Sequence, residues 1–434
     1  MDVNVIGSIV LLGVFLLFVV LRMPIAFALG VASFAAALVL GIPAPVQFVA
    51  QQMAEGINSF SLLTIPFFIL AGVIMSEGGI AVRLIDFANI FVGFIRGGLA
   101  MVNVVASMFF GGITGSSVAD ASSIGSVMIP MMEKEGYDRD YAVDVTITAS
   151  TQGIIVPPSH NAILFCLAAG GGVSIGKVFM GGIIPGVFLG LMVMLISYVI
   201  AVKRGYPKGR RISLKEAFKI TREALLGLVT PLIIVGGIVT GYFTATESSA
   251  IAVVYALFVT VFLYRTIKIK DLPRVFGASI RTIGIVMLLI ATASAFGKMI
   301  AYMQLPDLVM NTMLGISKTP WVILVMINFI LLFLGCIMDM APIILVVTPV
   351  LLPLVTKIGM DPVHFGIMLL LNLAIGLLTP PVGSTLFVGC AIGNISMEKV
   401  VKSLWPFYLT IVVVLILITY IPAVTMFLPN LLFK

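Results

Sequence analysis

Small oxygen-bearing residues gather at two places in this chain, and at each place the backbone itself is interrupted. The first set lies in a glycine-rich turn and in the segment IVPPSHN: Ser116, Ser117, Pro157, Ser159 and Asn161. The second set surrounds another proline pair: Gly335, Asp339, Thr379, Pro380, Gly383, Ser384 and Thr385. Such oxygens suit a hard cation or a carboxylate ligand, and charge neutrality favours Na⁺ as the only metal. We therefore predict two paired sites for Na⁺ and substrate.

Single ionisable residues carry separate hypotheses. Asp339 has no cationic neighbour in its segment, which favours a ligand role because an unpaired carboxylate at membrane depth is costly. Lys298 follows a long apolar run, where it either contacts a substrate carboxylate or extends to the interface. Glu247 is predicted to help cap a helix that begins after Thr246. His160 is not required by a duplicated site, because its counterpart is Gly383.

Two further acidic residues and the three cysteines have structural readings. Asp120 and Asp144 face either the protein interior or the cytoplasmic surface. The cysteines stand singly in apolar surroundings, without metal-ligand spacing, and are interpreted as packing residues: Cys166, Cys336 and Cys390.

The composition places the chain in a membrane. Of its 434 residues, 61% are apolar and only 10% are charged, whereas soluble domains carry about a quarter charged residues. Apolar runs recur from residues 5–21, interpreted as a retained span, to residues 406–428. The net charge of +7 does not indicate nucleic-acid binding, because the basic residues gather at segment ends. We expect a multi-pass protein of a bacterial or archaeal cytoplasmic (inner) membrane, with the lipid bilayer as its surroundings.

Basic residues predict the orientation. The strongest cluster lies within residues 203–222, which the positive-inside rule marks as a cytoplasmic loop. A second cluster within residues 265–274 returns to the same face after two further spans. Counting crossings backwards places both termini in the periplasm.

An internal repeat appears when the chain is shifted against itself so that Gly112 meets Gly335. In the same register Gly153 meets Gly376, and the two proline pairs coincide. The basic loop inserts an odd crossing, which predicts inverted repeats over residues 1–202 and 223–434. Each repeat contains a re-entrant hairpin (about 98–132 and 321–357) and a proline-broken helix (about 141–170 and 362–393).

These elements predict an all-α polytopic membrane protein. Broken helices at membrane depth are tolerated only inside protein or beside water, where their ends offer free carbonyl and N–H groups to ions. Alternating access requires one domain to move against a fixed frame, as in an elevator-type transporter. The predicted frame is residues 5–21, 24–41, 224–241 and 246–264, linked to the moving domain by the amphipathic stretches 80–95 and 301–316.

Four motifs resemble the large membrane subunit of tripartite ATP-independent periplasmic (TRAP) transporters, of the DctM or SiaM type. They are FGGITGSSVAD (110–120), IVPPSHN (155–161), GYFTATE (241–247) and GLLTPPVG (376–383). The resemblance implies an elevator carrier whose hairpins and broken helices hold Na⁺ and substrate. It also implies a small four-helix membrane subunit, expected as a separate chain, and a periplasmic binding protein for organic acids such as C4-dicarboxylates or sialic acid.

Competing classes of protein fit less well. No HExxH or Walker A sequence is present, only two histidines exist, and Gly115-Ser116-Ser117 has no base in its own segment, so no catalytic residue and no organic cofactor are predicted. An ion channel and a stand-alone sodium/anion elevator carrier without a binding protein stay open as alternatives.

Overall fold

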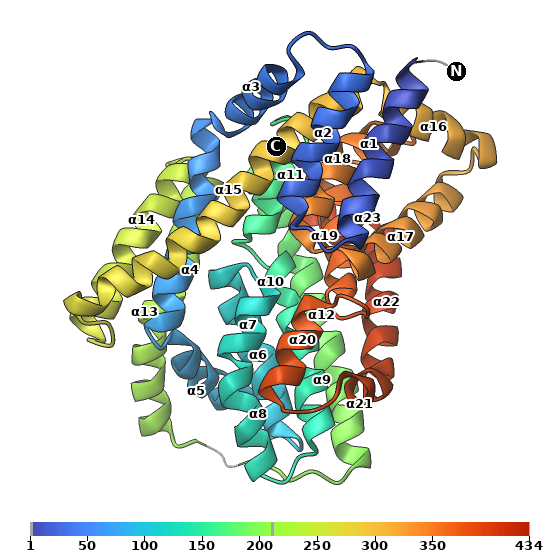
Figure 1. The fold of residues 1–434 in the computed structure, drawn as a ribbon. Helices are drawn as coiled ribbons and strands as arrows, with labels where there is room; N and C mark the ends of the chain where they lie inside the picture. The colour runs from blue at the N-terminus through green and yellow to red at the C-terminus, as the bar shows by residue number, and fades with distance from the viewer. Residues whose placement is uncertain (1–2, 210–211, 434) are drawn as a thin grey trace.

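The computed structural model describes residues 3–209 and 212–433, and the regular structure in these residues is helical (Figure 1). Seven of the described helices are long and apolar enough to cross a membrane, or eight if the bent pair α21–α22 is one span. Many large apolar side chains point outward, among them Leu191 at 58% and Phe329 at 74% exposure. Outward apolar surface of this extent suits contact with lipid. The predicted all-α polytopic membrane fold is confirmed.

The first half of the chain begins with four helices and a short 3₁₀ turn: α1 (Val3–Val20), α2 (Ile25–Val39), α3 (Pro45–Ile57), η1 (Phe60–Leu63) and α4 (Thr64–Glu77). The short helix α5 (Ile80–Val92) leads into a hairpin made of α6 (Gly98–Thr114), α7 (Ser117–Ser123) and α8 (Gly125–Lys134). A broken helix follows as α9 (Arg139–Ser150), α10 (Gln152–Ile155) and α11 (His160–Ala168), and the long α12 (Ile175–Lys203) completes this half.

The second half follows the same order. It begins with α13 (Leu214–Val239), α14 (Ala245–Phe258) continued by the π-helical turn η2 (Val259–Leu263), α15 (Leu272–Tyr302) and α16 (Leu305–Ile316). The hairpin is α17 (Pro320–Ile337) with α18 (Met340–Lys357), and the broken helix is α19 (Pro362–Gly376) with α20 (Ser384–Ile392). The last helices are α21 (Met397–Ser403), α22 (Trp405–Tyr420) and α23 (Pro422–Leu432).

Equivalent elements recur in a constant register. The two broken helices begin at the equivalent positions Arg139 and Pro362, and the cis bonds Pro157–Pro158 and Pro380–Pro381 keep the same separation. Glycines permit close packing of each hairpin on its broken helix. A Cβ atom at Gly111 would lie 2.3 Å from the Cα of Gly153, and one at Gly335 would lie 3.1 Å from the Cα of Gly376. Each interrupted helix is therefore held directly against a hairpin.

The helices pack in two groups. In one, α15 crosses α2, α3 and α4, and α14 packs on α4 and α13; Figure 1 shows α15 running diagonally along this group. In the other, the hairpins and broken helices pack together with α12 and α22. The short helix α5 joins the groups by packing on both α6 and α13, and α16 does so through α15 and α18.

Several boundaries differ from the sequence-based expectations. The basic segment 203–222 is not one loop, because α13 already begins at Leu214, where the side chain of Ser213 accepts a hydrogen bond from the Glu216 N–H. Lys215, Lys219 and Arg222 are therefore helical, while Arg210 and Arg211 lie outside the described residues. The apolar run 406–428 is divided between α22 and α23.

Two smaller differences concern helix starts. The cap of α14 is Thr244 rather than Thr246, and Glu247 completes a capping box with it, so the predicted capping role of Glu247 is confirmed. The helix α3, which lies between two predicted spans, was not predicted; its signal in the sequence is Pro45 at the first helical turn.

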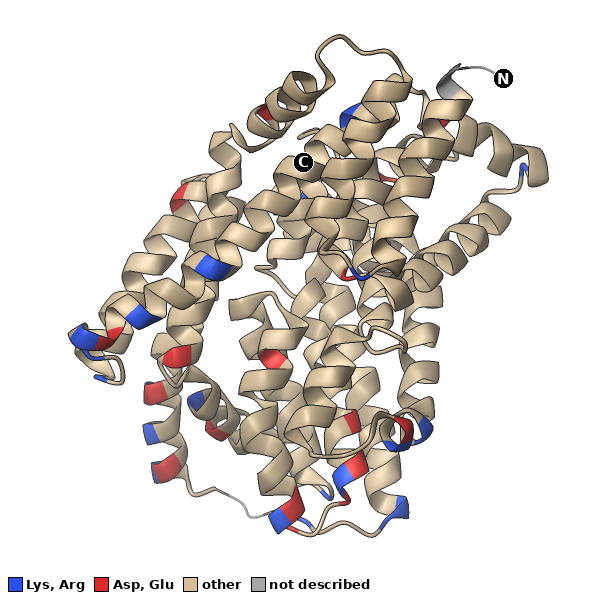
Figure 2. Cartoon of the chain, in the orientation of Figure 1, with Lys and Arg blue, Asp and Glu red and all other residues tan. Residues whose placement is uncertain are grey.

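Charged side chains gather at one end of the molecule. In Figure 2 they lie at the lower end, around the α8–α9 connection, the end of α12 and helix α21, with a further group at the α14–α15 connection. We call the lower end, defined by residues 133–140, 203–209 and 394–403, the charged end.

Candidate functional site

The first hairpin tip and the first break form one compact unit, tip–break 1. The Asn161 side-chain amide donates a hydrogen bond to the Gly115 carbonyl at 3.2 Å. Ser116 begins α7 as its N-cap, and its hydroxyl accepts from the Ala119 N–H. A Cβ at Gly115 would lie 2.9 Å from the His160 nitrogen, so only a glycine fits here at its φ of +63°.

Most of tip–break 1 is buried, while Ser116 is partly exposed. Ser117, Ser159 and Asn161 are 2%, 0% and 6% exposed, and Pro157 is buried as well. The Ser159 hydroxyl oxygen has no hydrogen-bond partner among the described residues. A buried hydroxyl without a partner is costly unless something else contacts it. The unit therefore holds a buried hydroxyl oxygen, that of Ser159, which is available as a ligand for an ion.

The second hairpin tip and the second break form the equivalent unit, tip–break 2. Asp339 is the N-cap residue of α18, and its Oδ1 accepts a long hydrogen bond of 3.5 Å from the Ser384 hydroxyl. In the repeat register Ser384 is the counterpart of Asn161, and Asp339 is the counterpart of Ser116. The Val382 N–H donates to the Cys336 carbonyl at 3.1 Å. In both units a hydrogen bond thus joins the hairpin tip to the break, although the bonding groups differ.

The two units differ in the solvent exposure of their residues. Asp339, Pro381 and Val382 are exposed, whereas Gly335, Gly383 and Thr385 are buried. Thr379 points back into its own helix, because its hydroxyl donates to the Ile375 carbonyl at 2.8 Å. Pro380 is partly exposed next to the cis bond. Asp339 of tip–break 2 is therefore accessible to solvent, whereas Ser117 and Ser159 of tip–break 1 are not.

A direct bond joins the two units. The hydroxyls of Ser117 in α7 and Thr385 in α20 lie 2.8 Å apart, although 268 residues separate them in the chain. Helix α20 packs on α7 and α8, and in the same exchanged manner α11 packs on α18. The structure thus brings the predicted hairpin and break residues into two contiguous units.

Lys298 is not part of these units. It is exposed on α15, and no ion pair to it is found among the described residues. Its neighbour Gly297 lines a cavity of about 670 Å³ with Leu345 and Pro349 of α18. Helix starts and a glycine-rich connection complete the lining, including Gly170, Gly171, Thr244 and Ala245. This cavity lies between the two helix groups, next to the end of α11.

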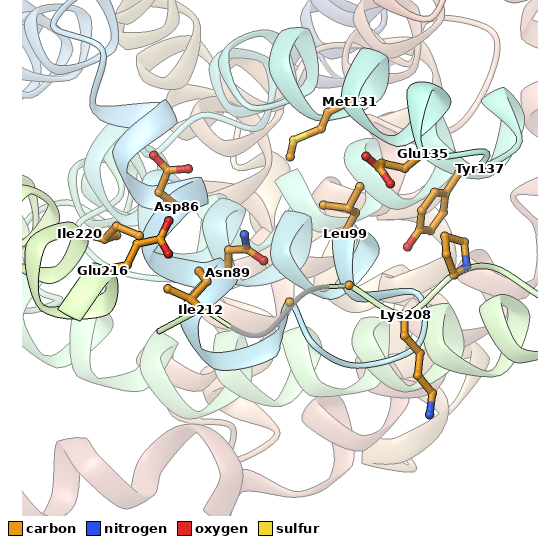
Figure 3. Close-up of a pocket in the computed structure, with 13 residues that line it drawn as sticks. Asp86, Asn89, Leu99, Met131, Glu135, Tyr137, Lys208, Ile212, Glu216 and Ile220 are labelled. Atoms are coloured by element: carbon orange, nitrogen blue, oxygen red, sulfur yellow. The ribbon is translucent and has the colours of Figure 1, made fainter. Parts of the chain in front are cut away.

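A second cavity lies between the helix groups near the charged end. It has a volume of about 450 Å³ and lies between α5, the start of α13 and the base of the first hairpin (Figure 3). Figure 3 shows Asp86 and Glu216 from the first two elements, with Glu135 and Tyr137 across the cavity. Burial and the neighbouring Glu223 carboxylate raise the pKa of Asp86 above its ordinary value.

An ion-pair cluster at the charged end was not anticipated from the sequence. Arg204, just beyond α12, contacts Asp138 at 2.9 Å and Asp140 at 3.2 Å. The Tyr206 hydroxyl donates to the same Asp138 carboxylate at 2.7 Å, and this hydrogen bond, with Arg204, lowers the pKa of Asp138. Burial, and after it the Asp138 carboxylate, raises the pKa of Tyr206 to about 12.

Other polar residues that the sequence left undecided are buried. Asp120 is 0% and Asp144 is 1% exposed, so both face the protein interior. Cys166 and Cys390 are buried and Cys336 is half-buried, and all three are free.

Tyr141 and His364, which are repeat counterparts, each contact a backbone carbonyl of a later helix at 2.7 Å. Tyr141 contacts the carbonyl of Ser197, and His364 contacts that of Ile418. Only the repeat register could have revealed this last pair.

Comparison with known proteins gives a consistent result. The family model described as "Tripartite ATP-independent periplasmic transporter, DctM component" matches residues 12–424. A C4-dicarboxylate TRAP transporter large permease from Pseudomonas aeruginosa is 39% identical over 398 residues, covering 92% of this chain and 93% of that protein. A sialic acid TRAP transporter large permease from Vibrio cholerae is 38% identical over 409 residues, covering 94% and 95%.

A solved structure shares the fold at low sequence identity. The YdaH transporter of Alcanivorax borkumensis superposes with a TM-score of 0.63 at 14% identity, covering 93% of this chain and 96% of that chain. The arrangement of helices is therefore that of a known transporter.

Proposed function

The chain belongs to the DctM component family of tripartite ATP-independent periplasmic transporters, and we propose from this premise that it is the large membrane subunit of a Na⁺-coupled importer of organic acids. It is a multi-pass transport protein and not an enzyme. On this proposal it lies in the cytoplasmic membrane, with the charged end on the cytoplasmic side by the positive-inside rule.

The observation that carries the proposal is the pair of tip–break units, joined by the bond between Ser117 and Thr385. Helix ends at membrane depth supply backbone carbonyls to cations and N–H groups to anions. In tip–break 1 the proposed ligands are Ser116, Ser117, Ser159 and Asn161, around the backbone of Pro157. The unpartnered Ser159 hydroxyl supports an ion at this position.

Tip–break 2 supplies the only carboxylate of the two predicted sets. We propose that Asp339 ligates Na⁺ with Ser384 and Thr385, while Gly335, Thr379, Pro380 and Gly383 shape the backbone around it. The solvent exposure of Asp339 supports exchange with a wet space. Lys298 is proposed to meet a substrate carboxylate across the cavity that Gly297 lines. No part of either unit calls for an organic cofactor.

The proposed substrate is an organic acid such as a C4-dicarboxylate or sialic acid, because permeases named for these substrates align over almost the whole chain. The proposed partners are a small four-helix membrane subunit and a periplasmic substrate-binding protein. The alternative is a stand-alone sodium/anion elevator carrier without a binding protein.

Transport by the chain with its small subunit in proteoliposomes tests the proposal. Radiolabelled succinate and N-acetylneuraminate are offered outside, with or without a periplasmic fraction of the source organism. We expect uptake of one substrate only when Na⁺ and the fraction are both present. Equal uptake with choline in place of Na⁺ would refute Na⁺ coupling. Full uptake without the fraction would support the stand-alone carrier.

Motion between the helix groups is proposed to be of the elevator type, and one contact allows a sharp test. Ser76 of α4 and Ser123 of α7 hydrogen-bond across the two groups at 2.8 Å. In a background without native cysteines, the pair Ser76→Cys and Ser123→Cys should crosslink and block transport until it is reduced. The control pair Asn103→Cys and Thr146→Cys, 2.7 Å apart within the hairpin group, should leave transport intact. Unimpaired transport with the first pair crosslinked would contradict motion at this contact.

A further inference from the structure

Asp144 is a buried carboxylate that neither tip–break unit uses. It lies on α9, one helical turn after Asp140, and is 1% exposed. Helix α20 covers the adjacent face of α9 closely, because a Cβ at Gly389 would lie 2.2 Å from Ile147 and one at Gly393 would lie 2.4 Å from Val143. Helix α21 packs on α9 as well. The carboxylate is therefore sealed in a seam between α9 and α20–α21.

The polar side chain beside Asp144 is Ser403 of α21. The Ser403 hydroxyl lies within hydrogen-bonding reach of the carboxylate, and the backbone carbonyls of Lys399 and Val400, at 3.2 and 3.0 Å, compete for its single hydrogen. The Oδ1 atom of Asp144 has no hydrogen-bond partner in the described residues. Two acceptor oxygens that face each other repel unless a hydrogen lies between them. A proton on Asp144 would donate to Ser403 and satisfy both.

The ionisable groups that face Asp144 do not supply a free positive charge. From its own helix comes Asp140, and from the end of α12 comes Arg204, which Asp138 and Asp140 already hold. Cys390 of α20 and Tyr408 of α22 also face it, and the Tyr408 hydroxyl donates to the Leu378 carbonyl. A buried ionised carboxylate without its own cation is strongly unfavourable.

Water has a short route to this seam. A cavity of about 500 Å³ at the charged end is lined by Asp138, Arg139, Asp140, Asn394, Ile395, Ser396 and Lys399. Asp140 precedes Asp144 by one turn of α9, and Lys399 precedes Ser403 by one turn of α21. The buried pair therefore lies one helical turn beneath the wall of the cavity, and a proton can reach it from that side.

We propose that Asp144 is a proton-binding site, filled from the charged end and closed by Ser403. The ligand is a proton rather than Na⁺, because one neighbouring hydroxyl offers too few further oxygens to share a hard cation. The step transfers one proton: Asp144–COOH and water give Asp144–COO⁻ and hydronium in the cavity. The ionised form needs water or Arg204, so deprotonation loosens the seam between α9 and α20–α21. The cytoplasmic location of the cavity rests on the proposed function; the protonation itself does not.

Infrared difference spectroscopy tests the site without any transport assay. Purified protein is compared between neutral and alkaline buffer, and the C=O band of a buried carboxylic acid should be lost as the pH rises. Asp120 is a second fully buried carboxylate, so the comparison is made in an Asp120→Asn background. There Asp144→Asn should lack this band, whereas Asp140→Asn, one turn away in the ion pair with Arg204, should keep it. Ser403→Ala should shift the band to higher frequency, because the acid loses its acceptor. An unchanged band in Asp144→Asn would overturn the proposal.

Flux measured with independent internal and external pH tests the consequence. Binding protein added only outside selects transporters whose cytoplasmic side faces the lumen. The wild type should change its rate severalfold with internal pH and little with external pH, while Asp144→Asn, a mimic of the protonated acid, should keep the acid-side rate throughout. The same pH response in wild type and Asp144→Asn, or a response of the band to Na⁺ instead of pH, would refute the proton site. Absence of any flux would count against the proposed function and leave the spectroscopic result unaffected.

Discussion

Tip–break 1 and tip–break 2 have the same chain geometry and opposite relations to their surroundings. The first is clasped by an amide, Asn161, onto the carbonyl of Gly115, and the hydroxyls of Ser117 and Ser159 are almost fully buried. The second is clasped by Ser384 onto Asp339 at 3.5 Å, with the carboxylate exposed. A duplicated backbone thus provides one neutral, sealed unit and one charged, accessible unit. We infer that the first is built for tight ion retention and the second for exchange.

The largest expected effect concerns the contact of each hairpin with its broken helix. Gly111→Ala would place a Cβ 2.3 Å from the backbone of Gly153, so the two helices must separate. Overpacking of this kind costs about 1–3 kcal/mol or more. Gly335→Ala is the matched control, because its Cβ would meet Gly376 at 3.1 Å. Thermal unfolding in detergent should show a clearly larger loss for Gly111→Ala, and equal losses would show that the two contacts are equally tight.

The next effect concerns the charge that only tip–break 2 possesses. Asp339→Asn should reduce transport by about tenfold or more, equivalent to about 1.4 kcal/mol or more, while membrane insertion and the melting temperature are retained. The reason is that an exposed carboxylate contributes to ion binding rather than to packing. Initial uptake rates against Na⁺ concentration measure the effect. Wild-type rates in a well-expressed variant would return Asp339 to a capping role.

Removing the hydrogen bond between tip and break should affect the stability of the two units differently. Asn161→Ala leaves the buried Gly115 carbonyl without a partner, which costs about 1–3 kcal/mol of stability. Ser384→Ala leaves the exposed Asp339 to water, so we expect almost no loss of stability. Both variants should weaken the dependence of uptake on Na⁺, because both remove a proposed ligand. A change of Na⁺ dependence in only one variant would mean that the two units have different roles.

The smallest effect concerns the start of the two broken helices. Asp138 accepts from Tyr206 and pairs with Arg204, whereas its repeat counterpart Asp361 caps α19 through the Val363 N–H at 2.7 Å. The Asp138 pKa is lowered, so this contact contributes stability above about pH 4 and loses it as the pH falls further through the folded-state pKa. Tyr206→Phe should weaken that acid dependence slightly, by less than about 1 kcal/mol, because the pair is exposed. Melting temperatures of the wild type and the variant between neutral pH and pH 3 would measure this difference. The same pH dependence in both proteins would assign the stabilisation of Asp138 to Arg204 alone.

The breaks and hairpins could be predicted because their causes are local. Adjacent prolines stop a helix wherever they occur, Gly111 permits close packing on Gly153, and Gly115 permits the turn at the end of α6. Exposure could not be predicted in this way. Ser159 and Val382 occupy equivalent positions, and only the packing of distant helices decides that the first is buried and the second exposed.

Long-range pairs were equally inaccessible to the sequence. The Ser117–Thr385 bond joins residues 268 positions apart, and Asp144 meets Ser403 from the opposite half of the chain. The extent of the basic loop was overestimated, because Lys and Arg are good helix formers and Ser213 allows α13 to begin within the cluster. Charge alone marks a membrane side and not a loop boundary.

The bond between Ser117 and Thr385 has an electrical consequence. Because it ties the two tip–break units together, any displacement of one along the membrane normal carries the other with it. On the proposed Na⁺-coupled elevator mechanism, the charge that crosses the transmembrane field is the sum of the bound cations, the substrate and Asp339. Each uncompensated elementary charge that traverses the full field contributes about 2.3 kcal/mol per 100 mV. The voltage dependence of transport should therefore report the difference between the cations bound and the negative charges of substrate and Asp339, as a single number per cycle.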